Sequence, residues 1–281
     1  HPYIASIYDS GLDKGVFYYA MQCIDGEELN IYARQAKLDI RESIVLMQKV
    51  IRGMQYAHEH DIIHRDLKPG NVMVTPQGDP KLLDFGLAKS TTDVEDSNLS
   101  MVGEIMGTPM YMSTEQARGM TDLIDGRTDI YSLGIMLYEL ITGDFPYSSE
   151  GGPFEIIRRK IESDPIRPRS INKDIDIDLE AIVLKSIALD RDDRYATALE
   201  MDEDLQRYLE GRPILARRHT FTYVGYKFLK RNRVRIAILL MLVSGIGAGY
   251  YVLDQQRRTD VAAQEVETQK LAKEKELLAL E

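Results

Sequence analysis

One ordered run of polar residues constrains this chain more than any other feature of its sequence. The run reads His-Arg-Asp-Leu-Lys-Pro-Gly-Asn over residues 64–71. A strand-like Val-Met-Val, a turn and an apolar Leu-Leu pair separate it from Asp84-Phe85-Gly86. The aspartate of the run can orient a hydroxyl nucleophile and its lysine can meet a phosphate, while its asparagine and the second aspartate offer the oxygen ligands that Mg²⁺ prefers. These are the parts that phosphoryl transfer requires.

Each residue of the run has a simpler explanation when it is taken alone, because Asp, Asn, Gly and Pro are common in turns. That explanation does not account for the ordered set. The set resembles the catalytic loop and the metal-binding triplet of the protein kinases. The resemblance implies that Asp66 is the catalytic base, that Lys68 contacts the γ-phosphate of ATP, and that Asn71 and Asp84 bind Mg²⁺.

The same resemblance gives structural roles to the neighbouring residues. His64 and Phe85 are expected in a stacked spine together with Ile7 and Asp129. Asp129 is also expected to cap the backbone of the catalytic loop, and Gly86 completes the metal-binding triplet.

A long polar stretch between Gly86 and Glu115 resembles an activation segment. It has about 28 residues, which is too long for an idle connector, and its hydroxyl-bearing residues include Thr91, Thr92, Ser97 and Ser100. Arg65 is then the cation with which a phosphorylated residue of this stretch would pair. The alternative is an ordinary loop whose hydroxyl groups occur by chance.

Residues 107–115 resemble the motif that closes this segment in the kinases. The match departs at Thr114, where the family usually has proline. The resemblance implies a buried ion pair between Glu115 and Arg194, and it places Thr108 beside the catalytic base and the substrate hydroxyl. Thr108 and Lys68 together indicate serine/threonine rather than tyrosine specificity.

Residues 1–8 and 16–21 read as two short strands joined by a turn, and they resemble the fourth and fifth strands of the kinase small lobe. The sequence lacks the glycine-rich loop, the third-strand lysine and the helix with a paired glutamate that the family places earlier. We therefore expect an N-terminally truncated kinase, with residues 1–25 as a remnant of the small lobe and hinge, and we expect the fragment alone to be inactive.

Five residues are expected at the ATP pocket because of the resemblance alone. Met21 lies at its back, the backbone of Gln22 and Ile24 meets the adenine edge, Glu28 lies near the ribose, and Met73 lines the pocket. A methionine on a strand is more often simply part of the core.

The remainder of the lobe, residues 26–210, is expected to be mostly helical, which makes the fold α+β and protein-kinase-like. Residues 39–59 have helical apolar spacing and a capping box formed by Asp39 and Glu42. Residues 129–142 are apolar on most faces, so that helix should be buried. Further helices are expected at 154–161, 179–189 and 196–209.

Residues 236–253 contain no charge and are just long enough to span a bilayer. The alternative is a buried core helix, but the lobe is complete without it. Basic residues are concentrated in the preceding juxtamembrane segment, 211–235, which predicts a cytoplasmic kinase domain, a single membrane pass and a helical extracytoplasmic tail over 254–281. The basic segment would bind anionic lipid, and Gly245, Gly247 and Gly249 would permit a homodimer.

Composition limits the remaining possibilities. A formal net charge of -10 argues against a nucleic-acid partner. One cysteine, Cys23, excludes an internal disulfide framework and a zinc cluster. The sequence therefore predicts a membrane-anchored serine/threonine protein kinase of the bacterial, eukaryotic-like (Hanks) type that uses ATP and Mg²⁺ on protein substrates. The alternatives are a non-catalytic membrane pseudokinase or scaffold, and a small-molecule phosphotransferase of related fold.

Overall fold

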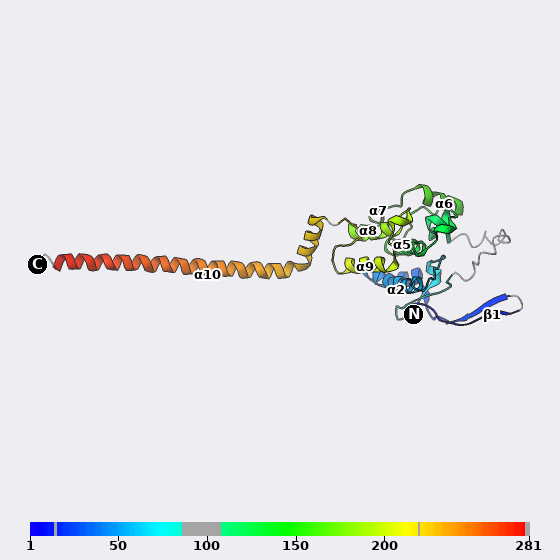
Figure 1. The fold of residues 1–281 in the computed structure, drawn as a ribbon, viewed down its shortest axis with the longest axis horizontal. Coiled ribbons are helices and arrows are strands. Elements are labelled where there is room, and N and C mark those ends of the chain that lie inside the picture. Colours follow the sequence, from blue (N-terminus) through cyan, green and yellow to red (C-terminus); the bar gives the residue numbers. More distant parts are fainter. Residues whose placement is uncertain (14–15, 86–107, 219, 279–281) are drawn as a thin grey trace. The chain divides into compact units, whose positions relative to one another are not determined.

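The computed structural model describes residues 1–13, 16–85, 108–218 and 220–278, with the backbone alone at residues 16, 17, 108 and 271–278. The chain divides into two compact units, His1–Thr220 and Phe221–Glu281. The first unit combines short strands with a set of packed helices, and the second is a single helix (Figure 1). The protein-kinase-like α+β class predicted from the sequence is confirmed.

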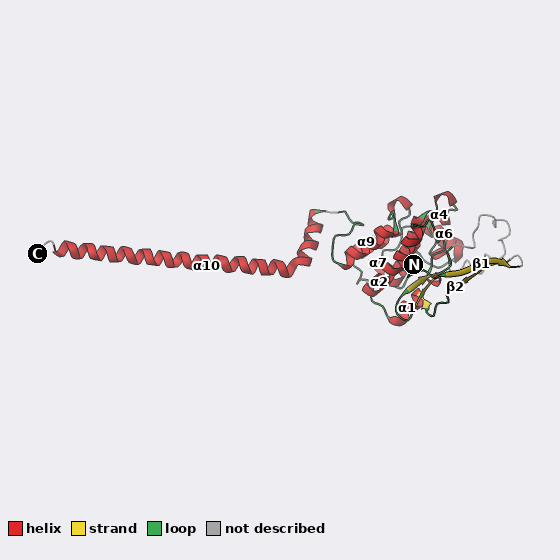
Figure 2. Cartoon of the chain, turned by 60° about the horizontal axis from the view of Figure 1, so that its bottom comes forward, coloured by secondary structure: helices red, strands yellow, loops and turns green. Residues whose placement is uncertain are grey.

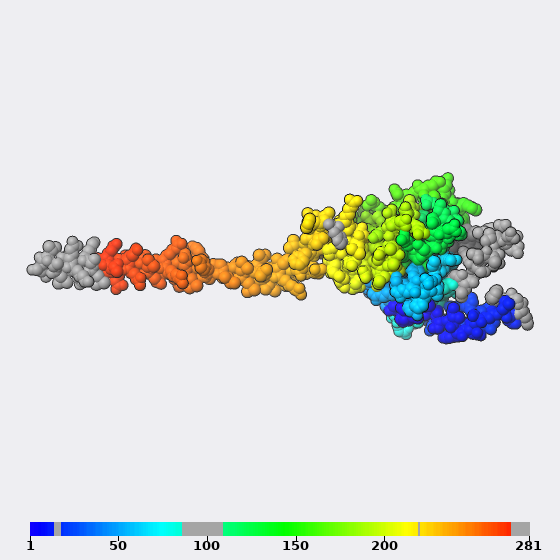
Figure 3. Space-filling model, in the orientation of Figure 1, coloured from blue at the N-terminus to red at the C-terminus, as the bar shows by residue number. Residues whose placement is uncertain are grey.

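An antiparallel hairpin precedes the helices of the first unit. Strand β1 (Ile7–Asp13) pairs with β2 (Val16–Met21), and this hairpin projects from the edge of the unit (Figure 3). The first strand was expected at residues 1–8, which is wrong. Residues 3–5 instead bond to the backbone of Leu82, with Leu82 N donating to Tyr3 O at 2.8 Å and Ala5 N to Leu82 O at 2.9 Å. The start of the chain is thus attached to the larger, helical part of the unit.

A second, three-stranded sheet lies within that part (Figure 2). It has the order β3 (Glu27–Glu28), β4 (Val72–Val74) and β5 (Pro80–Leu82), and both pairings are antiparallel. Val72, Val74 and Leu82 are almost fully buried. This small sheet sets the positions of the residues at its ends, including those of the candidate site.

The core of the unit is formed by helices that pack on one another. Helix α2 (Ile40–His58) packs against α5 (Gly126–Thr142) and α9 (Ala198–Leu209), and α5 packs against α8 (Ile177–Ser186). The predicted capping box of α2 is confirmed, because Asp39 accepts from Glu42 N at 2.7 Å and Glu42 accepts from Asp39 N at 2.8 Å.

The other elements are shorter. They are α1 (Leu29–Ala36), η1 (Pro69–Asn71), η2 (Thr108–Met110), α4 (Thr114–Ala117), η3 (Thr121–Leu123), α6 (Gly152–Glu162), α7 (Pro168–Ile171) and η4 (Arg191–Asp193). The predicted helices at 129–142, 154–161, 179–189 and 196–209 correspond to α5, α6, α8 and α9, with bounds that differ by up to three residues. As predicted, α5 is buried over most of its length.

The second unit is helix α10 (Phe221–Leu278). It contains an 18-residue window that is long and apolar enough to cross a membrane, and that window is not buried within the described residues. The predicted span 236–253 lies inside this helix, and the predicted helical tail is helical as far as Leu278. Part of the basic segment is helical too, because α10 begins well before residue 236.

Candidate active site

The β4–β5 hairpin brings the two predicted metal ligands to one end of the sheet. Val72 lies opposite Leu82, so that the preceding Asn71 and the following Leu83 are neighbours. Leu83 N donates to Asn71 O at 2.9 Å, which continues the pairing by one step. Asp84 is the next residue along the chain. Residues thirteen positions apart in the sequence thus come together because a short turn folds the chain back.

The catalytic loop is tied together by its own side chains. Lys68 Nζ donates to Asp66 Oδ2 at 2.9 Å, and both side chains are about one-third exposed. Asn71 Nδ2 donates to the main-chain oxygen of Asp66 at 2.7 Å and lies 3.5 Å from Asp66 Oδ2. The structure therefore places Asp66, Lys68 and Asn71 in one cluster, with the carboxylate within reach of a solvent-borne substrate.

Asp129 holds the backbone of the catalytic loop by accepting hydrogen bonds from it. Its carboxylate is fully buried on α5; Oδ1 accepts from Arg65 N and Oδ2 from His64 N, each at 2.9 Å. This is the contact that the resemblance implies. His58 Nε2 also lies 2.9 Å from Oδ2, a contact that the sequence did not indicate. Three groups from two elements thus converge on one carboxylate, which fixes the residues immediately before Asp66.

Two residues of the site have left-handed backbone conformations. Arg65 has φ +67° and Asp84 has φ +51°. Such values are uncommon for residues other than glycine and are maintained where surrounding contacts require them. The two bonds from Asp129 and the Leu83–Asn71 bond supply such contacts. A left-handed residue therefore precedes Asp66, and Asp84 is itself left-handed.

The residues at this end of the sheet fit Mg²⁺. Because the Asn71 amide nitrogen is engaged by Asp66, its Oδ1 is the atom left for a ligand. Asp84 is exposed and accepts a hydrogen bond from the Tyr19 hydroxyl at 3.3 Å. The negative charge of Asp84, burial and this hydrogen bond raise the pKa of Tyr19. Mg²⁺ typically takes one or two protein oxygens and completes its shell with water and phosphate. Among the described residues no cluster of three His, Cys, Asp or Glu side chains competes with this pair.

Two of the residues expected at the ATP pocket lie in the same sheet. Glu28 on β3 lies directly opposite Met73 on β4. Met21 is the last residue of β2. The backbone N–H of the following Gln22 donates a hydrogen bond to Ser6 O at 2.8 Å. Met21, Gln22 and Ile24 are partly exposed. The structure thus pairs Glu28 with Met73 next to the catalytic loop, while the adenine contacts of Gln22 and Ile24 remain predictions.

The closing segment, residues 108–117, is anchored by the expected ion pair. Arg194 Nη2 and Nη1 donate to the two Glu115 oxygens at 2.8 and 2.9 Å, and both side chains are almost fully buried. Thr128 adds a third donor to Glu115 at 2.7 Å. Burial raises the pKa of Glu115, but the hydrogen bonds and charge of Arg194 outweigh it and lower the pKa to about 2. Thr114 also belongs to this network, as a donor to Leu189 O at 2.7 Å and an acceptor from Arg194 at 2.9 Å.

Comparison with known proteins agrees with this geometry. The model of the protein kinase domain matches residues 1–204. The chain belongs to the protein kinase family. Serine/threonine-protein kinase PknB of Mycolicibacterium smegmatis is 37% identical over 216 residues, which are 75% of this chain and 34% of the relative.

Two further relatives are similar to this kinase chain. PknB of Mycobacterium tuberculosis is 35% identical over 218 residues, covering 76% of this chain and 34% of the relative. A probable serine/threonine-protein kinase of Clostridium acetobutylicum is 36% identical over 203 residues, which are 72% of this chain and 30% of the relative. The predicted relation to bacterial kinases of the Hanks type is confirmed. The chain spans about a third of the length of the curated relatives that it matches.

Some residues expected of a kinase cannot be placed. Gly86 and the hydroxyl-bearing residues Thr91, Thr92, Ser97 and Ser100 lie outside the described residues. The backbone of Thr108 begins η2, but its side chain is not described. Arg65 is exposed, and its predicted partner in the activation segment also lies outside the described residues.

The expected spine is only partly formed. The rings of His64 and Phe85 lie 5.0 Å apart, and His64 contacts Asp129 through its backbone. Ile7 is 53% exposed on β1, so the prediction that it stacks in a buried spine is wrong. The reason is that, among the described residues, β1 pairs with β2 alone.

The kinase chain also contains contacts that the sequence reasoning missed. Gln116 Nε2 donates to Arg65 O at 2.6 Å, which joins the closing segment to the residue before Asp66. Gln116 also caps α4 together with Ser113. That capping box is visible as Ser-x-x-Gln in the sequence, but the contact with Arg65 is not, because it joins residues 51 positions apart.

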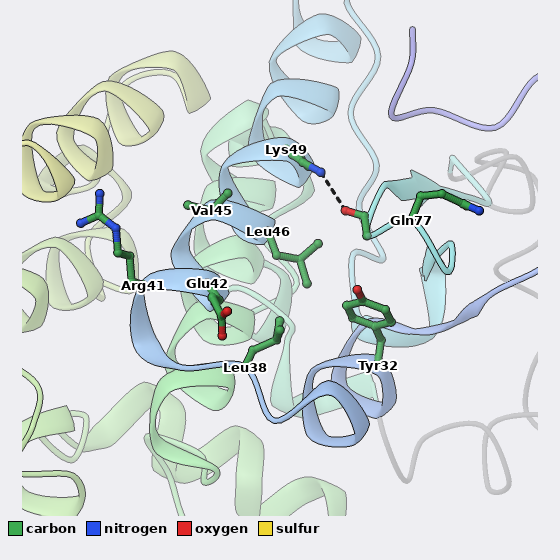
Figure 4. A pocket seen from close by; sticks show the side chains of 9 residues that line it. Tyr32, Leu38, Arg41, Glu42, Val45, Leu46, Lys49 and Gln77 are labelled. Atoms are coloured by element: carbon green, nitrogen blue, oxygen red, sulfur yellow. Dashed lines mark hydrogen bonds between the residues drawn. The ribbon is translucent and has the colours of Figure 1, made fainter.

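A hollow of about 340 Å³ lies between the α1–α2 connection and the turn after β4 (Figure 4). Two of its charged side chains are engaged: Lys49 Nζ donates to Gly78 O at 2.8 Å and to Asp79 at 2.7 Å, and Glu42 caps α2. None of the catalytic-loop residues lines it. The hollow is therefore separate from the candidate active site.

Proposed function

We propose that this protein is a serine/threonine protein kinase that transfers the γ-phosphoryl group of ATP to serine or threonine hydroxyls of proteins. The observation that carries the proposal is the cluster of Asp66, Lys68 and Asn71 with Asp84 at the same end of the β4–β5 hairpin, in a chain of the protein kinase family. The names of the bacterial relatives support the choice of serine and threonine.

Each residue of the cluster has a definite task in this proposal. Asp66 orients the attacking hydroxyl and accepts its proton. Lys68, which pairs with Asp66 in the structure, turns its ammonium toward the transferred phosphoryl group and offsets its charge. Asn71 Oδ1 and the Asp84 carboxylate would hold Mg²⁺, which when bound neutralises charge on the phosphates. Met21, Gln22, Ile24, Glu28 and Met73 would bind the nucleotide, and Thr108 would lie at the acceptor hydroxyl.

The proposal extends to the division of the chain and to its location. Residues 1–25 would belong to the small lobe and 26–210 to the large lobe. Residues 236–253 would span a membrane once, with the basic segment 211–235 against anionic lipid on the cytoplasmic side and 254–281 outside. The apolar stretch of α10 supports this location. A homodimer through the span remains part of the proposal.

The first experiment measures transfer of labelled phosphate from ATP with Mg²⁺ by the full-length protein, to itself and to myelin basic protein. The full-length Asp66→Asn protein is assayed beside it. We expect transfer that falls by about 10²-fold or more in Asp66→Asn, because the hydroxyl loses its base. Absence of transfer by the wild-type protein would favour a pseudokinase or scaffold.

A further inference from the structure

Three successive carbonyl groups of the closing segment are held by side chains from outside it. Lys160 Nζ, on α6, donates to Met110 O at 2.7 Å and to Met112 O at 2.6 Å. Ser132 Oγ, on α5, donates to the intervening Tyr111 O at 2.9 Å. A turn between η2 and α4 cannot satisfy these carbonyls through regular secondary structure. The side chains from α5 and α6 therefore define the conformation of the segment here.

Lys160 is an unusual residue for such a task. Its side chain is fully buried, and none of the described carboxylates forms an ion pair with it. Burial and the nearby Arg194 lower the pKa of Lys160 well below its usual value. A buried ammonium group is costly unless specific partners compensate it. Here the partners are the two carbonyls and the ring of Tyr131, whose centroid is 5.0 Å from Nζ.

The same ring connects the two anchors of the closing segment. The Arg194 guanidinium lies 4.9 Å from the centroid of the buried Tyr131. Arg194 holds Glu115, and Lys160 holds Met110 and Met112. Two cations on one aromatic side chain of α5 thus fix both parts of the segment, through contacts that favour cations near a ring face.

The segment that these cations fix lies beside the catalytic loop. Gln116 Nε2 reaches Arg65 O at 2.6 Å, one residue before Asp66. A change in the path of residues 110–112 would therefore shift the surface next to the base rather than a remote part of the lobe.

We propose that Lys160 is a positioning residue for the protein substrate: by holding Met110 O and Met112 O, it fixes the part of the closing segment against which the acceptor polypeptide lies. The inference rests on the proposed kinase function. It assigns Lys160 no contact with ATP, with Mg²⁺ or with the transferred group. Loss of Lys160 should then impair use of the protein acceptor more than it impairs turnover of ATP alone.

The test compares the full-length wild-type protein with Lys160→Met, which keeps the length of the side chain and removes its donors. Lys185→Met is the matched control, because Lys185 also lies over a tyrosine ring, that of Tyr195 at 4.4 Å, and among the described residues it has no hydrogen bond to the closing segment. For each protein, kcat and KM are measured with myelin basic protein, together with KM for ATP and ATP hydrolysis without acceptor.

We expect Lys160→Met to lower kcat/KM for myelin basic protein by about ten- to hundredfold, as a misplacement of roughly 1 Å would. ATP hydrolysis without acceptor and KM for ATP should stay near wild type, and Lys185→Met should behave as wild type throughout. An equal loss in both reactions, or no loss in either, would overturn the proposal.

Hydrogen exchange supplies a readout that does not depend on activity. In Lys160→Met, exchange should accelerate in peptides covering residues 108–117 and stay unchanged in those covering α2. Unchanged exchange at 108–117 would overturn the role of Lys160 even if the protein is an active kinase. If the wild-type protein transfers no phosphate, the proposed function fails, and exchange still decides whether Lys160 holds the segment. If Lys160→Met does not fold, Lys160→Gln is measured in the same way.

Discussion

Thr114 occupies the position where proline is usual in kinases, and its hydroxyl group is fully used. The side chain is buried, donates to Leu189 O at 2.7 Å and accepts from Arg194 Nη2 at 2.9 Å. A proline could do neither. The threonine therefore adds a polar connection between the Glu115–Arg194 ion pair and the chain after α8.

Replacing Thr114 tests this connection. Thr114→Val keeps the shape of the side chain but leaves Leu189 O with only the longer 3.4 Å contact from Arg194 Nη2, and it removes the acceptor that Arg194 has in Thr114. We therefore expect a loss of about 1–3 kcal/mol in the free energy of unfolding. Thr114→Ser keeps the hydroxyl and is the control, with a smaller loss. Urea denaturation of the two variants gives both values. Equal stability of Thr114→Val and wild type would show that the hydroxyl contributes nothing.

The ion pair itself makes stability depend on acid pH. The pKa of Glu115 is about 2 in the folded protein, below its usual value of 4.5. Its charged form is therefore favoured by folding, and this stabilisation is complete above pH 4.5 and is lost as the pH falls through about 2. In Glu115→Gln we expect a loss of roughly 3 kcal/mol at neutral pH that shrinks toward pH 2.

The measurement is the free energy of unfolding of wild type and Glu115→Gln at several pH values. Glu59→Gln, at the C-terminal end of α2, is a control because Glu59 is exposed. A difference between wild type and Glu115→Gln that stays constant from pH 7 to pH 2 would contradict the assignment.

The helices were predictable because their signals are local. Asp39 and Glu42 predict the start of α2, and the apolar residues on most faces of α5 predict a buried helix. The order of the catalytic residues was equally readable, since a short hairpin joins them. Strand β1 was misplaced because Tyr3 and Ala5 pair with Leu82, far along the chain. Long-range pairing of this kind leaves no pattern in the segment itself.

Helix α5 influences the active site through Asp129, and substitution of Asp129 tests this influence. In Asp129→Asn, one carboxylate oxygen becomes an amide donor, so either His64 N or Arg65 N loses its acceptor. We expect kcat to fall by about 10²-fold, because the loop before Asp66 shifts, while KM for ATP changes less. Asp176→Asn is the control, since asparagine caps a helix such as α8 as well as aspartate does. Similar kinetics in both variants would refute this role.

The second unit gives the protein its expected attachment to a membrane. Helix α10 exposes a continuous apolar surface that includes Leu239, Leu240, Met241, Leu242 and Val243. Arginine at the centre of a span costs roughly 2.5–3.5 kcal/mol, so Leu240→Arg combined with Met241→Arg should move the full-length protein from the carbonate-resistant membrane fraction to the supernatant. Thr268→Arg, outside the apolar stretch, should not. Retention of the double variant would contradict the span.

The direction of insertion follows from the basic residues on either side of the apolar stretch. Arg231, Arg233 and Arg235 stand directly before it, whereas the first basic residues after it are Arg257 and Arg258. Basic residues stay on the cytoplasmic side, so the first unit should be inside. Cys23 is exposed and is the single cysteine of the sequence, which makes it a natural probe of that side.

In intact cells a membrane-impermeant maleimide should leave Cys23 unlabelled and should label Gln256→Cys in a Cys23→Ser background. After permeabilisation both cysteines should react. Labelling of Cys23 but not of Gln256→Cys in intact cells would reverse the orientation, and would place the kinase unit on the side where ATP is scarce. Equal labelling of both would indicate that the helix does not cross the membrane. The proposed kinase function and the proposed topology therefore depend on each other, since only a cytoplasmic Asp66 can meet its nucleotide.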